Sequence, residues 1–581
     1  MKKNLLLSTS VLLSVFATIS MASAQTIPAN IAPQIGTIQQ QDIDSVKRLE
    51  QEKRGIRDYQ NRQVGKEKKA TEQKKKKPKA TEPAKPEEYE TKGVYIKKIE
   101  IPKSEILSDE EISNVLKDYE KTNMTMSDIK GLVEKINELY LNKGYVTARA
   151  YLPEQTIESG QLKIALMEGK VGKITIEGNR WTNESHIKDR LDIGEGEIFN
   201  IRKLEENMLI YNRYNDNIAL KGDLQGGKKE GTTDVKIKVE EKAPYHVIAV
   251  ADNAGRETIG KGRAGLIGVH DSLFGYRDRL SAGVYANRYS WTPFVDYNIP
   301  VNKYDGRLGA SFSYNNAEVG RGNYKDFDIE SRSQNYSIYY THPIIRELHM
   351  ELNNTTSYTY KRATTRISGV NVSRDKIPEF KDGLNFRYDT DNGVWYLAQS
   401  VSYAAPLFQD RIKYWKFEGS ITRLQNFGYR LLGNFRGNYQ YIPEKNIPYA
   451  DQMSAGGSGS VRGYSQGLLT AKSGYQLSAE LYFPISPEKL ELFGDAYYVD
   501  NYIRPFAFTD YAMLYPENSV GSTGKNRLVS TGAGVRVQLP YDIALKVAYG
   551  VPLKHNNLEK ESGGKWVLEL SYSPDLNSLF Q

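Results

Sequence analysis

The sequence predicts a closed, all-β transmembrane barrel of about sixteen antiparallel strands in residues 243–581, preceded by two small α+β domains and an N-terminal helix. Three observations predict this fold class. From residue 243 onward, strand-like segments alternate between apolar and polar residues. The two preceding units mix strand and helix patterns. At roughly 20 residues for each strand with its connection, the long β-segment accommodates about sixteen strands.

Residues 1–24 have the pattern of a secretory signal peptide. Lys2 and Lys3 precede an apolar region from Leu5 to Ile19, and the small residues at 22–24 predict cleavage before Gln25. A single membrane anchor is the alternative, but the apolar region is short and interrupted by serines. No later stretch reaches about eighteen uninterrupted apolar residues. If the exported chain spans a membrane, it must therefore do so as a closed β-barrel.

Residues 25–91 are polar and contain a strongly basic stretch. In 25–63, apolar residues near helical spacing predict a helix, and three alternatives stay open: a surface helix, a disordered segment or a plug inside the barrel. Residues 64–91 are rich in lysine and proline, which predicts an extended, solvated linker. Nine lysines and three glutamates lie between Lys66 and Lys85, so this short segment supplies most of the net charge of +8. We therefore expect no nucleic-acid partner.

Residues 92–169 form the first predicted α+β unit and residues 170–242 the second. In the first, Thr125 and Asp128 mark a helix start, and one apolar face follows at helical spacing. Its expected strands are Val94 to Ile101, Val146 to Leu152 and Gln161 to Met167. In the second unit we expect strands at Val171 to Ile176 and Thr233 to Val239, with helices near His186 to Leu191 and Ile201 to Tyr211.

The stretch from Tyr140 to Gln155 closely resembles the ShlB-type POTRA domain, a periplasmic polypeptide-binding module. The residues that carry the signature are Gly144, Tyr145, Arg149, Pro153 and Gln155. The second unit resembles another POTRA domain. Gly144 suits a left-handed helix cap and Pro153 suits a strand end, so most of the signature is expected to be structural.

Four segments show the barrel alternation most clearly. One parity is apolar and the other carries polar or charged residues in the stretches 415–422, 477–483, 543–549 and 566–573. A soluble β-sandwich shows the same alternation, so no single strand decides between the two folds. The sequence also leaves open whether Trp566 to Tyr572 or the tail after Pro574 closes the barrel.

A glycine-dense stretch at 456–464 contains the motif Val461, Arg462, Gly463 and Tyr464. Phe493 and Asp495 follow about thirty residues later in a strand-like segment. Together they resemble the lid-loop tip and the barrel-wall partner of the outer-membrane polypeptide-transporter superfamily. The resemblance implies that residues 450–475 fold into the barrel. There Arg462 would pair with Asp495 and set secretion competence. The alternative is an exposed extracellular loop on which Arg462 contacts only water.

Enzyme signatures are not found in the sequence. It has no His-Glu-x-x-His motif and no Walker loop, and no cysteine is available for a disulfide, a thiolate site or a nucleophile. The six histidines do not cluster at metal-ligand spacing. We therefore expect no enzyme activity, no cofactor and no metal.

Taken together, these motifs resemble two-partner secretion outer-membrane transporters of the ShlB/FhaC/HecB type, the TpsB family. The resemblance implies a Gram-negative outer membrane, periplasmic POTRA domains and type V secretion of a partner exoprotein, recognised through its N-terminal secretion domain. It also implies contact with outer-membrane lipid and insertion by the barrel-assembly machinery. The alternatives are a BamA-type assembly factor, a passive porin and a soluble binding protein.

Overall fold

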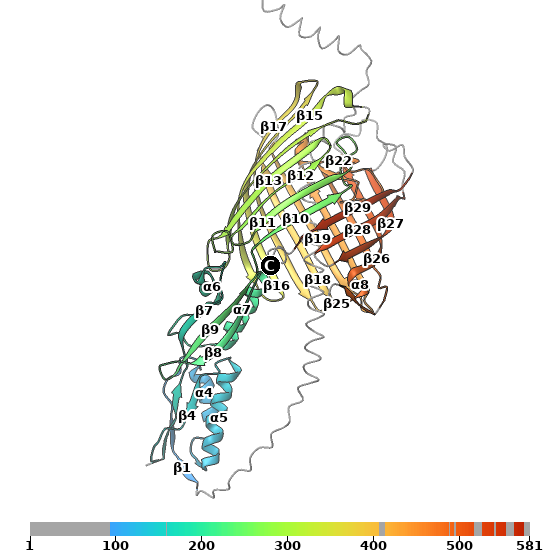
Figure 1. Cartoon of the computed structure of the whole chain (residues 1–581). Helices are drawn as coiled ribbons and strands as arrows, with labels where there is room; N and C mark the ends of the chain where they lie inside the picture. The colour runs from blue at the N-terminus through green and yellow to red at the C-terminus, as the bar shows by residue number, and fades with distance from the viewer. Residues whose placement is uncertain are drawn as a thin grey trace, which may run out of the picture.

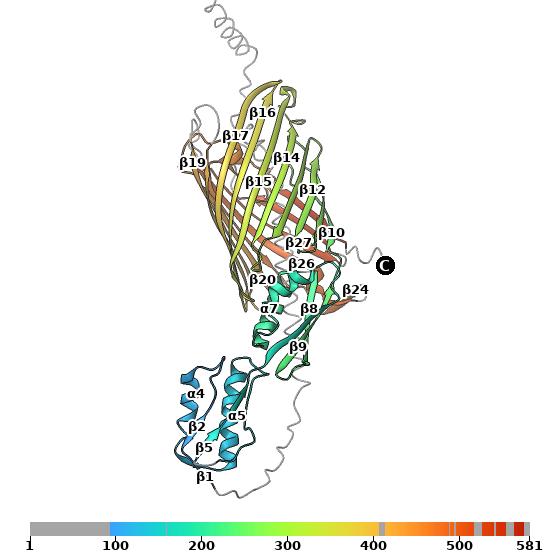
Figure 2. The ribbon, with the colours of Figure 1, turned by 90° about the vertical axis from the view of Figure 1, so that its left-hand side faces the viewer.

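The computed structural model describes residues 93–574, except for gaps at 158–159, 216, 323, 406–412, 487, 493–494, 516–525, 540–541 and 554–562. The predicted signal peptide, N-terminal helix and linker therefore lie outside the described residues. Two α+β units follow one another beneath one end of a large barrel (Figures 1 and 2). No helix in the described part of the chain is both long enough and apolar enough to cross a membrane.

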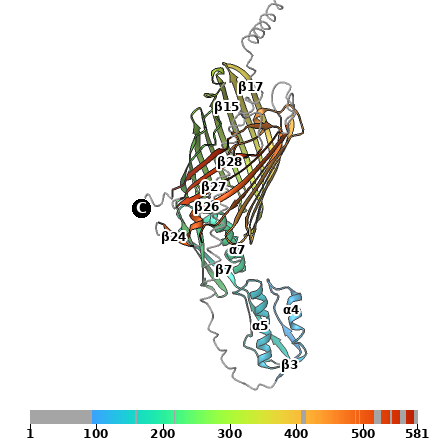
Figure 3. The same cartoon turned by 90° about the vertical axis from the view of Figure 1, so that its right-hand side faces the viewer.

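Sixteen antiparallel strands close into a single barrel, as the alternation and the length of this segment predicted. The strands are β10 (Tyr245–Asp252), β11 (Arg263–His270), β12 (Arg279–Asn287), β13 (Ser290–Pro300), β14 (Arg307–Glu318), β15 (Ile329–Arg346), β16 (Met350–Ile367), β17 (Val370–Thr390), β18 (Gly393–Ala404), β19 (Tyr414–Asn426), β20 (Leu432–Tyr441), β23 (Ser473–Tyr482), β26 (Ile503–Tyr515), β27 (Asn526–Leu539), β28 (Ile543–Pro552) and β29 (Lys565–Tyr572). The first and last strands lie side by side on the wall (Figure 1), and Figure 3 shows their neighbours β26, β27 and β28 from another side.

Closure answers the question that the sequence left open. β29 pairs antiparallel with β10, from Ala249 opposite Tyr572 to Asp252 opposite Glu569. Asn253 extends this seam, because its side chain accepts from the Leu568 amide at 3.0 Å and donates to the Trp566 carbonyl at 2.9 Å. The segment from Trp566 to Tyr572 is therefore the closing strand.

The two parities of the strands face different surroundings. In β29, Trp566 and Leu568 are 61% and 44% exposed, while Val567 and Glu569 are 4% and 8% exposed. β19, β23 and β28 show the same pattern, with the polar or charged parity turned inward. Apolar side chains therefore cover the outer surface and polar side chains line the lumen, as a water-filled transmembrane barrel requires.

One predicted wall segment is not part of the wall. β24 (Lys489–Leu492) and β25 (Asp495–Tyr498) pair only with each other, and helix α8 (Val499–Tyr502) follows them. β23 pairs directly with β26, so the β24–β25 hairpin belongs to the connection between these two strands. Four-residue strands are also too short to cross a membrane, which takes about 9–11 residues. The segment does form strands, but its assignment to the barrel was wrong.

The first α+β unit packs two helices against short strands. Its elements are β1 (Val94–Ile96), β2 (Lys98–Glu100), α4 (Asp109–Leu116), β3 (Thr122–Met124), α5 (Met126–Asn142), β4 (Arg149–Tyr151), β5 (Gln161–Lys163) and β6 (Ala165–Met167). The Thr125 hydroxyl accepts from the Asp128 amide at 3.2 Å, and the Asp128 carboxylate accepts from the Thr125 amide at 2.7 Å. This capping box starts α5, whose buried face includes Leu132 and Ile136.

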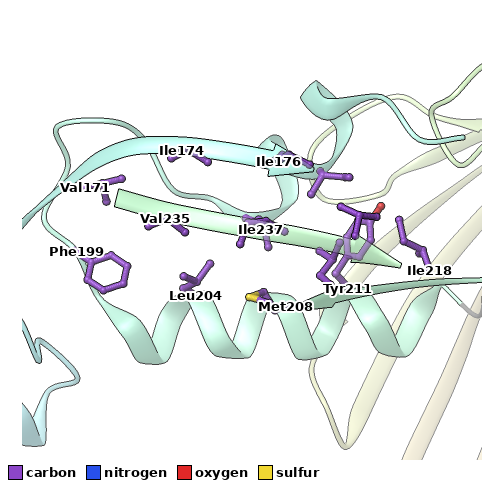
Figure 4. Close-up of a cluster of buried hydrophobic side chains, with 14 residues drawn as sticks. Val171, Ile174, Ile176, Phe199, Leu204, Met208, Tyr211, Ile218, Val235 and Ile237 are labelled. Atoms are coloured by element: carbon purple, nitrogen blue, oxygen red, sulfur yellow. The ribbon is translucent and has the colours of Figure 1, made fainter. Parts of the chain in front are cut away.

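The second unit has a strand–helix–helix–strand–strand order. β7 (Lys170–Glu177), β9 (Thr232–Glu241) and β8 (Ile218–Gly226) form one sheet in that order, and α6 (Glu184–Leu191) and α7 (Ile201–Tyr214) complete the unit. Leu204, Met208 and Tyr211 of α7 point toward Val235 and Ile237 of the central strand (Figure 4). α4, β3 and β8 were not predicted from the sequence.

Gly144 lies where the two units meet. It adopts φ +88° after α5, and a Cβ there would lie 2.7 Å from Cγ of Arg202. The Arg202 guanidinium donates to the carbonyls of Asn142 and Leu141 at the end of α5, at 2.5 and 3.3 Å. The amide of Ile201, which opens α7, donates to the Gly144 carbonyl at 3.1 Å. The glycine therefore allows α7 to cap the preceding helix and couples the two units.

Candidate functional site: a loop held inside the barrel

The connection between β20 and β23 folds against the inner face of the barrel. It carries a short hairpin, β21 (Met453–Ala455) and β22 (Leu469–Ala471), and a tip at residues 456–467. Val461 and Tyr464 at the tip are 0% and 3% exposed, and they belong to an apolar cluster with wall residues from β26 and β27. We call residues 442–472 the inward loop.

Arg462 is the main polar attachment of this loop. Its Nε and Nη2 atoms donate to Asp510 Oδ2 and Oδ1 on β26, both at 2.7 Å, and its backbone amide donates to Oδ2 at 3.0 Å. Nη1 pairs with Glu480 on β23. The guanidinium carbon also lies 3.5 Å from the centroid of the Phe508 ring. Arg462 is 2% exposed and both carboxylates are 0% exposed, so the pairs are shielded from bulk water.

Glu480 connects Arg462 to a larger charged network on the wall. Its carboxylate also receives Lys546 Nζ at 3.2 Å, Arg436 Nη2 at 3.3 Å and the Tyr482 hydroxyl at 2.6 Å. These groups come from β28, β20 and β23, which flank the tip. Because every carboxylate oxygen is engaged, the buried charges are compensated. Ser478 adds a hydroxyl that donates to Asp510 at 2.8 Å.

Two glycines let the tip lie against the wall backbone. Gly463 adopts φ +93°, and a Cβ there would lie 2.8 Å from the carbonyl carbon and oxygen of Gly550 on β28. A Cβ at Gly550 would in turn lie 2.7 Å from the Gly463 amide. Neither position has room for a side chain. The neighbouring Tyr464 hydroxyl donates to the Val529 carbonyl at 3.0 Å, which attaches the tip to β27 as well.

A second attachment joins the base of the inward loop to other wall strands. Asp451 accepts from Lys361 Nζ on β16 at 2.7 Å and lies 3.6 Å from Lys416 Nζ on β19. Glu379 on β17 pairs with both lysines, at 2.8 and 3.3 Å. The Tyr414 hydroxyl also donates to Asp451. The loop is therefore held at Asp451 on one side and at Arg462 on the other.

The predicted site residues have different outcomes. Val461, Arg462, Gly463 and Tyr464 lie together at the tip. The expected pairing of Arg462 with Asp495 is wrong, because Asp495 lies in the hairpin strand β25 and the guanidinium is engaged by Asp510 and Glu480. Phe493, the other predicted wall partner, lies outside the described residues. Glu480 was visible in the sequence only as a charged residue of the inward parity, and Asp510 was missed.

The POTRA signature residues have structural positions. Gly144 joins the two units, and Tyr145 is partly buried against the core of the first unit. Arg149 lies exposed on β4, and Pro153 follows the end of that strand. The Gln155 side chain bonds both the amide and the carbonyl of Lys163, at 2.8 and 2.6 Å. Within the described residues, no group of three or more metal-ligating side chains occurs.

A sequence model of the haemolysin secretion/activation protein family ShlB/FhaC/HecB matches residues 231–537, which is more than half of the chain. The chain belongs to this family. The ShlB-type POTRA domain matches residues 94–169, and the POTRA surface antigen variable number repeat matches 169–242. As a family member, the protein is an outer-membrane transporter with its POTRA domains in the periplasm, so the inward loop enters the lumen from the extracellular side.

Curated relatives and solved structures agree with this assignment. The heme/hemopexin transporter protein HuxB of Haemophilus influenzae is 24% identical over 477 residues, which cover 78% of this chain and 82% of the relative. The hemolysin transporter protein ShlB of Serratia marcescens is 24% identical over 382 residues, 62% of this chain and 66% of the relative. The structure of CdiB from Escherichia coli aligns with a TM-score of 0.63 at 18% identity, covering 85% of this chain and 93% of that chain.

Proposed function

We propose that the protein exports one large exoprotein, of the adhesin or haemolysin type, through its barrel to the cell surface. The observation that carries the proposal is the inward loop, attached to the wall of a closed barrel by the buried Arg462–Asp510 pair. A loop held by a few compensated ion pairs and two glycine contacts can be released and reattached. A passive porin would also leave the two POTRA domains without a role.

The periplasmic domains offer a place for an unfolded client to bind. β8 is an edge strand of the β7–β9–β8 sheet. The Asn212 side chain bonds the amide and the carbonyl of Leu220 on its outer edge, at 2.7 and 3.0 Å. Because alternate residues of a strand present their amides to the same side, Gly222 and Leu224 present theirs to this edge too. We propose that an extended client segment adds here as a further strand, since backbone pairing tolerates varied sequence.

Movement of the client is proposed to need no catalytic site. The client would enter unfolded from the POTRA domains, displace the inward loop and fold outside the cell. Folding outside would make each step hard to reverse. Binding to outer-membrane lipid and insertion by the barrel-assembly machinery remain part of the proposal, and the helix predicted in 25–63 is a candidate plug for the resting pore.

The second candidate is a BamA-type assembly factor. This candidate is supported by similarity of fold. A BamA structure from Haemophilus ducreyi aligns with a TM-score of 0.55 at 15% identity, covering 83% of this chain and 100% of that chain. At this identity the likeness concerns the fold alone. Two POTRA units and the ShlB-type first unit favour the secretion transporter.

Depletion of the protein separates the two candidates. A secretion transporter should leave the outer-membrane proteome intact and remove one exoprotein from the cell surface and the medium. An assembly factor should lower many outer-membrane proteins together. Quantitative proteomics of outer membranes and culture medium after depletion measures both. A broad loss of barrel proteins that precedes any loss of a secreted protein would contradict the proposal.

A further inference from the structure

A polar cavity of about 250 Å³ lies at the end of the lumen next to the second POTRA domain. The C-terminal end of α7, the turns at 271–278 and 301–306, and inward-facing residues of β12 to β16 enclose it. The charged residues among its lining are Arg277, Arg279, Arg307, Arg346, Asp271, Asp305 and Glu351. In the orientation of this family, the cavity lies at the periplasmic entrance of the pore.

Two of the carboxylates in the cavity are already paired. Asp305 binds Arg190 of α6 at 2.7 Å and also pairs with Arg346. Asp271 lies 3.6 Å from Arg279 and 3.7 Å from His246. These two carboxylates form ion pairs with Arg346 and Arg279 but not with Arg277 or Arg307, although the charge of Asp305 also acts on Arg307 without direct contact.

Arg277 and Arg307 lack such a partner. Arg277 is 6% exposed, its Nε donates to the Asn215 side chain at 3.3 Å, and its Nη1 atom is buried with no hydrogen-bond partner among the described residues. Arg307 donates to the Asn298 side chain at 2.6 Å and to the Arg277 carbonyl at 2.7 Å. Neither guanidinium forms an ion pair with a carboxylate of the described residues. Burying an uncompensated cation is costly, so the site is expected to attract an anion.

Glu351 is the remaining carboxylate at this cavity. It accepts from the Asn353 side chain at 2.7 Å, and it forms no ion pair within the described part of the chain. It therefore lowers the positive potential of the cavity without neutralising either arginine directly. An incoming anion has to compete with this charge.

We propose that Arg277 and Arg307 form a carboxylate-binding site at the periplasmic entrance of the barrel. A planar guanidinium suits the two oxygens of a carboxylate, and two adjacent guanidiniums with unused donors can hold one from both sides. The anion comes either from an aspartate or glutamate side chain of the client in transit or from a small soluble anion. The first source rests on the proposed function, and the second does not.

Binding by the full-length protein in detergent tests the site directly. The probe is a short, fluorescently labelled, end-blocked peptide of glutamate and glycine, with a glutamine–glycine peptide as the neutral counterpart and inorganic phosphate as a competitor. We expect the Arg277→Gln/Arg307→Gln variant to bind the acidic peptide about tenfold more weakly or worse, and Glu351→Gln to bind it more tightly. Arg332→Gln is the matched control, because Arg332 is an exposed arginine near the opposite end of β15.

The possible results bear either on the binding site itself or on the source of its anion. The proposed site is contradicted if the double variant binds the acidic peptide as tightly as the wild type does, or if the wild type binds the acidic and neutral peptides equally. Phosphate could raise the thermal stability of the wild type but not of the double variant, while the acidic peptide does not bind. In that case the site binds a small soluble anion, and the client does not supply the carboxylate. An Arg277→Lys/Arg307→Lys variant that recovers binding shows that the glutamine variant failed through lost charge rather than misfolding. A protein that binds the peptide but secretes nothing refutes the proposed function and leaves the site standing.

Discussion

Arg462 on the inward loop and Asp510 on β26 form a two-point ion pair, with Nε and Nη2 each 2.7 Å from a different carboxylate oxygen. The Arg462 amide adds a third bond to the same carboxylate at 3.0 Å. Asp510 therefore fixes both the side chain and the backbone at the tip of the loop. This geometry makes the attachment sensitive to single substitutions.

Arg462→Gln and Asp510→Asn should each release the tip of the loop. Arg462→Gln leaves the buried Asp510 without its ion-pair partner, and Asp510→Asn leaves the buried Arg462 with Glu480 as its remaining ion-pair partner. Removing one partner of a buried pair costs about 3–5 kcal/mol. Hydrogen–deuterium exchange of residues 456–467 should therefore lose protection by at least about tenfold, which corresponds to about 1.4 kcal/mol. The double variant should cost less than the sum of the two single variants. Strictly additive effects would mean that the two side chains do not act as a pair.

Gly463→Ala should displace the tip from β28, because the added methyl group would overlap the Gly550 carbonyl. Left-handed backbone alone costs alanine about 1–2 kcal/mol, so the overlap must be separated from this strain. Gly322→Ala is the matched control, since Gly322 has φ +81° and no atom within 4 Å of the added Cβ. Secretion and loop protection should fall in Gly463→Ala only. Equal effects of the two substitutions would argue against close packing at Gly550.

Asp451→Asn should loosen the base of the inward loop. Lys361 and Lys416 would lose one of the carboxylates that compensate them. Glu379 would still pair with both lysines, and Glu418 would still pair with Lys416. A loosened loop obstructs the lumen less, so the conductance of single channels in planar bilayers should rise. Asp326→Asn removes an exposed carboxylate from the loop between β14 and β15 and serves as the control. Identical conductance in wild type and Asp451→Asn would show that this attachment does not restrict the pore.

The second POTRA domain should lose stability in mild acid through His186. Burial disfavours the imidazolium and, with the nearby Arg190 charge, lowers the pKa of His186 from 6.5 to about 3. Between these values the unfolded chain binds a proton that the folded domain does not. Stability should therefore fall as the pH drops below 6.5, by up to about 1.4 kcal/mol per pH unit.

Limited proteolysis in urea at pH 7 and pH 5, scored by cleavage within α6 and α7 of the full-length protein, measures this effect. A His186→Leu variant should show a smaller difference between the two pH values. Substituting the exposed His349 by glutamine should leave the difference unchanged. A wild-type domain that resists cleavage equally at both pH values would contradict the assigned burial.

The sequence predicted the features that depend on local pattern. The alternation around Trp415 and Trp566 is a property of each strand, and its outward and inward faces follow from the pleat. The start of α5 follows from Thr125 and Asp128, which bond each other three residues apart. The turn at Gly144 depends on one residue that tolerates positive φ.

The partner of Arg462 could not be predicted in the same way. Asp510 lies 48 residues away, and its contact with the tip depends on the register of β26 against β23 and on the path of the loop. The sequence around Asp495 alternates between apolar and polar residues as clearly as that of a barrel strand. Its two strands, β24 and β25, have only four residues each and are too short to cross a membrane. The cavity at Arg277 and Arg307 depends likewise on how the second POTRA domain docks beneath the barrel.

Site-specific photocrosslinking of a client stalled during export tests the central claim most directly. Ser337 and Ile338 are neighbours on β15: Ser337 has the inward parity, and Ile338 is 61% exposed on the outer face. With a photoreactive residue at 337, the client should crosslink to the barrel, and at 338 it should not. Crosslinks at 338 alone, or at neither position while the client still reaches the surface, would contradict passage through the lumen.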